Sequence, residues 1–116
     1  MLSASIDVRF DKLPRLSAAM HQRAADAVES AARECEGWAK IFVPVDTGAT
    51  RSSIDAQPEA GDDLTWVVAP HTDYALFLEL GTHGRAARPF MAQASEAAKP
   101  GFIEDMGKIA EEAARE

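Results

Sequence analysis

The stretch LPRLSAAMHQRAADAVESAARECEGWAKIF, residues 13–42, decides the fold because its apolar residues recur at steps of three and four. This spacing gathers them on one face of an α-helix and leaves charged residues on the opposite face. Pro14 suits a first helical turn, and Pro44 ends the pattern because proline cannot donate a backbone hydrogen bond. We therefore predict an amphipathic helix over residues 13–42, about 45 Å long at 1.5 Å per residue.

Three strand patterns flank this helix. Residues 3–10 alternate between apolar and polar side chains, which predicts a strand with one buried face. Further along, residues 53–57 and 64–69 predict two more strands, the second rich in β-branched and aromatic residues. The polar sequence QPEAGDD, residues 57–63, is expected to join them as a loop.

Shorter helical segments follow the long helix. A short turn is predicted at 48–54, and residues 73–80 predict a short helix that ends at Gly81. Three of its apolar residues fall together on one face: Tyr74, Phe77 and Leu78. Residues 90–115 predict a last helical region, which Pro100–Gly101 is expected to break into two pieces.

Length and composition fit one α+β domain over residues 1–116, with a long N-terminal helix packed on a small, mainly antiparallel sheet, a short helix and a C-terminal helix. Alanine makes up much of the apolar content, so we expect a thin core and stabilisation by oligomerisation. The net charge of −7 argues against nucleic-acid binding by the chain as a whole. Cys35, the single cysteine, is expected to be a small buried apolar residue.

The string VPVDTG, residues 43–48, is the sharpest local motif. Its Asp46-Thr47-Gly48 is like the loop of homodimeric retroviral-type aspartic proteases, in which two carboxylates share a proton. That loop should follow a β-strand in an almost all-β fold, whereas here a long helix and a proline precede it. In the simpler interpretation, Pro44 ends the helix and Asp46 and Thr47 hydrogen-bond the backbone of a turn. The protease remains the alternative function.

Other chemistry finds little support in the sequence. His71, Asp73, Glu79 and His83 lie close along the chain, but none of them forms a zinc-ligand spacing, so we predict solvated loop histidines and no metal. No Gly-x-Ser-x-Gly elbow and no phosphate-binding glycine loop is present. We predict neither a catalytic site nor a cofactor.

Four basic residues gather near the recurring motifs: Arg51, His83, Arg85 and Arg88. On an acidic chain, this local excess predicts a docking surface for a neighbour's carboxylates or for DNA phosphates. The alternative is a set of solvated loop side chains.

The order of motifs resembles a family of phage proteins. A long helix leads into Pro-x-Asp-Thr-Gly with the sequel Arg51–Ile54, a strand pair follows, and then come YALFLELGT at 74–82 and RPFM at 88–91 before a last helix. This arrangement, over about residues 13–115, is similar to the minor virion proteins of tailed phages, the gene-product-ten-like head–tail joining and tail-completion proteins. Leu80, where relatives often have an aromatic residue, and the short loop at 83–88 depart from the pattern.

The resemblance implies a non-enzymatic virion protein that forms a ring, often of six subunits, at the neck or the top of the tail. Its partners would be copies of itself, an adaptor or head-closure ring, and the tail tube or tail terminator, with DNA only as passing cargo and no membrane. The motif residues would have structural roles. Three groups would fix, in turn, the loop after the long helix, the short helix with its exit, and the last helix. They are Pro44, Asp46, Thr47 and Gly48; Tyr74, Glu79, Gly81 and Thr82; and Pro89 and Phe90.

Two further hypotheses complete the sequence-based expectations. Glu79 is expected to pair with Arg51 or Arg88, within a subunit or across the ring. A host-encoded protein-interaction module without a phage link is a third possible function, after the neck protein and the protease.

Overall fold

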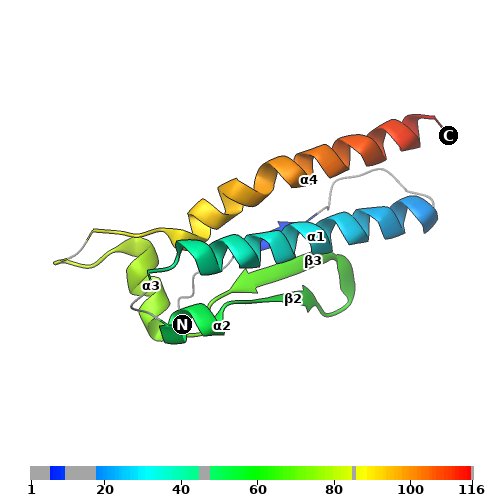
Figure 1. The fold of residues 1–116 in the computed structure, drawn as a ribbon. Coiled ribbons are helices and arrows are strands. Elements are labelled where there is room, and N and C mark those ends of the chain that lie inside the picture. The colour runs from blue at the N-terminus through cyan, green and yellow to red at the C-terminus, as the bar shows by residue number, and fades with distance from the viewer. Residues whose placement is uncertain (1–5, 10–17, 45–47, 85, 116) are drawn as a thin grey trace.

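The computed structural model describes residues 6–9, 18–44, 48–84 and 86–115. The elements follow one another as a strand, two helices, a strand pair and two helices, and the fold class is α+β, as predicted (Figure 1). Their bounds in chain order are β1 (Ile6–Arg9), α1 (Ala18–Phe42), α2 (Gly48–Ser53), β2 (Asp55–Glu59), β3 (Asp62–Ala69), α3 (Asp73–Leu80) and α4 (Phe90–Ala114).

The three strands form one sheet in the order β1-β3-β2, and both pairings are antiparallel. Val8 of β1 lies opposite Trp66 of β3, and Gln57 of β2 lies opposite Val67. The central strand β3 buries Thr65, Trp66 and Val68, which agrees with its β-branched and aromatic composition. The strand predicted at 3–10 is confirmed over Ile6–Arg9, and its remaining residues lie outside the described part of the chain.

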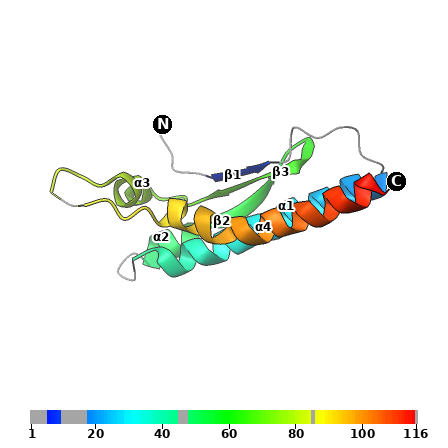
Figure 2. The ribbon, with the colours of Figure 1, turned by 90° about the horizontal axis from the view of Figure 1, so that it is seen from above.

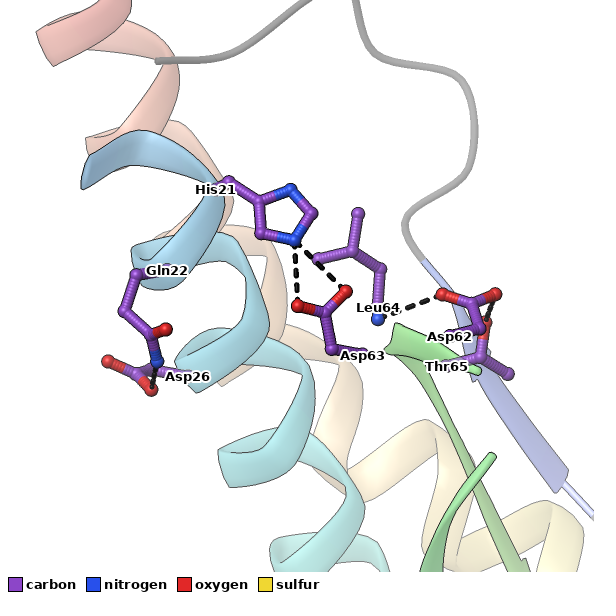
Figure 3. Close-up of polar contacts among 7 residues, drawn as sticks. All are labelled: His21, Gln22, Asp26, Asp62, Asp63, Leu64 and Thr65. Atoms are coloured by element: carbon purple, nitrogen blue, oxygen red, sulfur yellow. Dashed lines mark hydrogen bonds and ion pairs between the residues drawn. The ribbon is translucent and has the colours of Figure 1, made fainter. Parts of the chain in front are cut away.

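The turn between β2 and β3 is shorter than predicted. Instead of a loop over 57–63, β2 runs to Glu59 and β3 begins at Asp62, so only two residues turn the chain. Gly61 has φ 79°, a left-handed conformation that glycine adopts without steric cost. The Asp62 carboxylate accepts hydrogen bonds from the Leu64 N–H (3.0 Å) and the Thr65 hydroxyl (2.8 Å), which hold the start of β3 (Figure 3).

Helix α1 carries the buried face that its spacing predicts. It ends at Phe42, the predicted end, and the Val43 N–H still donates to the Ala39 carbonyl at 2.9 Å before Pro44 follows. Residues 13–17 of the predicted helix lie outside the described residues. Most of the buried positions of α1 are alanines, and small side chains allow close approach of a packed neighbour. The buried residues are Met20, Ala24, Ala27, Val28, Ala31, Ala32, Cys35 and Ala39.

Helices α1 and α4 lie side by side in opposite directions, and the sheet lies on one side of them (Figures 1 and 2). One core cluster joins α1, the sheet, α3 and the first half of α4, and its largest fully buried side chains include Phe90, Ile54 and Met91. A second, smaller cluster joins Met20 and Ala27 of α1 to Ile109 of α4. The molecule is elongated, with principal extents of 56 × 26 × 21 Å.

The prediction that Pro100–Gly101 breaks the last helix was wrong, because α4 continues through both residues. Pro100 has no N–H to donate to the carbonyl of Glu96. Packing on both sides of it offsets this loss, since Ala98 is buried and Phe102 packs against the main core cluster. At Gly101 a β-carbon would come within 3.2 Å of a Glu34 carboxylate oxygen, so α4 passes close to α1 there.

The first turns of α1 are attached to the start of β3 by a histidine. The His21 Nε2 lies 2.9 and 2.8 Å from the two carboxylate oxygens of Asp63 (Figure 3). The His21 side chain is about half exposed, and its partner comes from 42 residues away in the sequence.

Replacing the helix-interior proline should stabilise the protein. Pro100→Ala restores a backbone donor to α4 at an exposed position, so we expect the free energy of unfolding to rise by about 1–3 kcal/mol. Urea denaturation followed by circular dichroism measures this change. The neighbouring exposed substitution Lys99→Ala is the control, with an expected change within about 0.5 kcal/mol. A loss of stability in Pro100→Ala would show that the bend at proline is needed for packing.

Candidate functional site

A set of polar contacts attaches α2 to the residues that precede α3. The buried Thr50 hydroxyl lies 2.8 Å from the Thr72 hydroxyl. The Ser53 hydroxyl donates to the Thr50 carbonyl (2.7 Å) and accepts from the His71 N–H (2.9 Å). Because a buried hydroxyl is costly to leave without a partner, the Thr50–Thr72 contact favours one position of α2 against the start of α3.

A histidine–aspartate pair continues this set toward the sheet. The His71 Nε2 lies 2.7 Å from a carboxylate oxygen of Asp55, the first residue of β2. The hydrogen bond from His71 is the largest cause that lowers the pKa of Asp55 below its usual value. His71 is an exposed residue between β3 and α3, as the sequence predicts for a solvated loop histidine, but its carboxylate partner was not predicted. Exposed pairs of this kind contribute little to stability.

At the other end of α3, Glu79 reaches the N-terminus of α4. Its two carboxylate oxygens accept hydrogen bonds from the Met91 N–H at 2.9 Å and the Ala92 N–H at 3.3 Å. The first N–H groups of a helix lack partners within the helix, and the helix dipole favours a negative charge there. Pro89, at the N-cap position of α4, makes no side-chain capping bond. Glu79 therefore caps α4 from a neighbouring helix.

The chain between α3 and α4 is closed at its base. Gly81 ends α3 with φ 80°, and its N–H donates to the Phe77 carbonyl at 2.8 Å. The Arg88 N–H donates to the Leu78 carbonyl at 2.6 Å, which brings the end of the loop back beside α3. Phe90 then enters the core, almost fully buried. The two ends of the segment between α3 and α4, at Gly81 and Arg88, are therefore both fixed to α3.

The expected ion pair of Glu79 is absent within the described part of the subunit. Both Glu79 oxygens accept from the α4 backbone, and neither Arg51 nor Arg88 has an ion pair among the described residues. A carboxylate at a helix N-terminus satisfies two donors at once, which explains why Glu79 lies there. A pairing across subunits stays a prediction.

The predicted motif residues occupy one end of the molecule, from the end of α1 to the start of α4 (Figure 1). Pro44 follows α1, Gly48 begins α2, Tyr74 and Glu79 belong to α3, and Phe90 begins α4 after Pro89. Thr82, His83 and Arg88 are exposed in the loop after Gly81, and Arg51 is exposed on α2. Asp46, Thr47 and Arg85 lie outside the described residues, so their predicted roles stay predictions.

Sequence reasoning missed Thr50, Ser53 and Thr72, which form the attachment of α2 to α3. A threonine directly before a helix usually signals a capping side chain. Thr72 has the extended backbone of a cap, but its hydroxyl contacts Thr50 instead of an α3 N–H. The signal for position 72 was present in the sequence, whereas the identity of its partner depends on the tertiary fold.

Among the described residues, no group of three or more histidine, cysteine, aspartate or glutamate side chains could hold a metal ion. Cys35 is buried as predicted, and burial, with a smaller contribution from Glu34, raises the pKa of its thiol to about 11. It is therefore protonated at neutral pH and a poor nucleophile. No helix in the described part is long and apolar enough to cross a membrane.

The apolar residues of α3 divide between two faces. Ala75 and Leu78 are buried in the core, whereas Tyr74, Phe77 and Leu80 are exposed. Of the three residues that the sequence places together on one face of this helix, Leu78 reaches the core, whereas Tyr74 and Phe77 stay exposed beside it. An outward face with large apolar side chains is a candidate contact surface.

Removing the Glu79 carboxylate should weaken the attachment of α4. For Glu79→Ala we expect the free energy of unfolding to fall by about 1–2 kcal/mol, because two helix N–H groups lose their acceptor. Urea denaturation measures the loss. Glu96→Ala is the matched control, since Glu96 is an exposed glutamate on α4, and it should change stability by less than about 0.5 kcal/mol. Equal losses in both variants would contradict the capping role.

The comparison with known proteins agrees with this arrangement. No curated protein matches the chain, and no solved structure matches it. One family model matches residues 6–81, more than half of the 116 residues, and its description is "Bacteriophage HK97-gp10, putative tail-component". The match runs from β1 through α3 to Gly81 and stops before the RPF motif at 88–90. The chain therefore belongs to the HK97-gp10-like family of bacteriophage tail components.

Proposed function

We propose that this chain is a structural subunit of a ring at the neck of a tailed bacteriophage, or of a prophage or related particle, where it joins head to tail. The observation that carries the proposal is the tail-component family match over residues 6–81. That match, which includes the Pro-x-Asp-Thr-Gly turn and most of the LELGT motif, supports a place in the virion and a structural role without catalysis.

The partners follow from the position in the neck. They are further copies of the chain, six in a ring by the resemblance, together with an adaptor or head-closure ring on one side and the tail tube or tail terminator on the other. DNA passes through the channel as cargo. The net charge of −7 supports this role, because an acidic ring repels phosphates and allows the genome to slide.

The fixed end of the molecule supports a docking role for the motif residues. Helix α3 is held at both ends. The Thr50–Thr72 contact holds its N-terminal end, and the hydrogen bonds from the α4 backbone to Glu79 hold its C-terminal end. Exposed basic residues lie around this end, and they are the candidate contacts with neighbouring subunits or partner rings. These residues are Arg51, His83 and Arg88, with Arg85 by sequence.

The described surroundings of Asp46-Thr47-Gly48 favour the structural role over the aspartic protease. Helix α1 leads toward this turn and α2 begins at Gly48, whereas the protease loop needs a preceding strand. Four helices accompany the three-stranded sheet in the described chain, so the almost all-β setting of that enzyme class is lacking.

Deleting the gene from the virus tests the proposal. We expect DNA-filled heads and separate tails in electron micrographs, because assembly stops before the two parts join. A wild-type copy supplied in trans should restore joined particles. An Asp46→Asn copy should restore them as well, since a structural turn tolerates the amide and a catalytic carboxylate does not.

Two results would contradict the proposal. Infectious particles formed in normal numbers without the gene would exclude a joining role. Failure of the Asp46→Asn copy, when it accumulates as a folded protein, would instead favour proteolysis.

A further inference from the structure

Helix α3 lies at one end of the molecule (Figure 1), and three of its large apolar side chains are exposed. Tyr74, Phe77 and Leu80 follow one another at steps of three, and they are 42%, 53% and 68% exposed. Residues three apart lie on the same side of a helix. We call these three residues the α3 face. Large apolar side chains gathered on a monomer surface mark a contact site more often than isolated ones do.

The α3 face is rigidly supported. The Thr50–Thr72 contact fixes the N-terminal side of α3, and Glu79 fixes its C-terminal side to α4. Ala75 and Leu78 of the same helix are buried in the core. A surface held in this way loses little conformational entropy when it binds a partner, which favours specific docking.

The two segments that contact the ends of α3 each carry an exposed arginine. Arg51 on α2 and Arg88 at the base of the loop are exposed, and neither has an ion pair within the described part of the chain. The basic residues on α1 and α4 differ in this respect, since several of them pair with carboxylates: Arg23, Arg33, Lys40 and Lys108. The partner of the α3 face should therefore be apolar at its centre and acidic at its edge.

The outer side of α4 has these properties. Ile103 is 58% exposed, and Glu96 lies seven residues earlier, about two turns away on the same side of the helix. Helix α4 carries five carboxylates, at 96, 104, 105, 111 and 112, against two lysines, at 99 and 108. Glu96 and Glu111 are exposed and have no ion pair among the described residues. We call Ile103, Glu96 and Glu111 the α4 flank.

We propose that the α3 face of one copy of this chain docks on the α4 flank of the next copy. Phe77 and Leu80 would cover Ile103, and Arg51 and Arg88 would approach Glu96 and Glu111. A symmetric contact between two α3 faces is disfavoured, because it would bring the unpaired arginines of both copies together. The inference rests on the ring assembly proposed above and names the surfaces that form it.

The contact joins two different surfaces, so every subunit in a ring uses both of them. Such a head-to-tail contact closes into a ring when the rotation between neighbours divides a full turn. Each contact is small compared with interfaces that hold stable dimers. Assembly should therefore depend on protein concentration, with closure of the ring adding stability that a single contact lacks.

Two charge substitutions at exposed positions test the proposal by complementation. Phe77→Asp places a carboxylate against the acidic flank, and Ile103→Arg places a cation against the arginines. In sedimentation velocity at up to about 1 mM, where weak contacts are populated, the wild-type chain should form a closed oligomer. Each variant alone should stay monomeric. Their equimolar mixture should associate, because the intact α3 face of Ile103→Arg meets the intact α4 flank of Phe77→Asp. At the other junction the two introduced charges face each other and are opposite in sign.

Ala60→Asp, at the exposed β2–β3 turn, adds a charge away from both surfaces and should assemble like the wild type. Circular dichroism spectra should confirm that all variants are folded. The proposal is overturned if the wild type stays monomeric at about 1 mM, where weak contacts are populated. It is also overturned if either variant assembles alone, or if the mixture of the two stays monomeric. A virus with Phe77→Asp that still yields joined particles would overturn this contact and leave the neck role standing.

Discussion

The carboxylate of Glu79 at the N-terminus of α4 is the interaction on which the motif-bearing end of the molecule depends. It satisfies two backbone donors of a helix whose N-cap residue, Pro89, offers no side-chain acceptor. Together with the bond from Arg88 to Leu78, it fixes the direction in which the chain leaves α3 and enters α4. The position of the α3 face relative to the α4 flank follows from this junction.

Features set by neighbouring residues along the chain were predictable from the sequence. The spacing of the apolar residues correctly predicted that α1 ends at Phe42. Gly81 correctly marked the end of α3, because the backbone there has a positive φ that glycine adopts easily. Pro100 shows where this reasoning fails. A local rule places a break at proline, but packing of Ala98 and Phe102 in the core keeps α4 continuous. Propensity is a weak guide when tertiary contacts oppose it.

The candidate site was only partly predictable for the same reason. The residue types of the LELGT and RPF motifs were recognised in the sequence, and the structure places both at one end of the molecule, in α3 and at the start of α4. The partner of Glu79 within the subunit was misjudged, since opposite charge suggested an arginine while the fold supplies backbone N–H groups twelve and thirteen residues away. Thr50 and His71 have partners that only the meeting of α2 with the start of α3 reveals.

Hydrogen exchange at the backbone N–H groups of Met91 and Ala92 tests the central claim most directly. First-turn amides of a helix lack partners within the helix and normally exchange quickly. If Glu79 accepts from both groups in solution, they should exchange as slowly as amides in the middle of α4. Exchange of both amides as fast as those of the exposed loop at 82–84 would contradict the account.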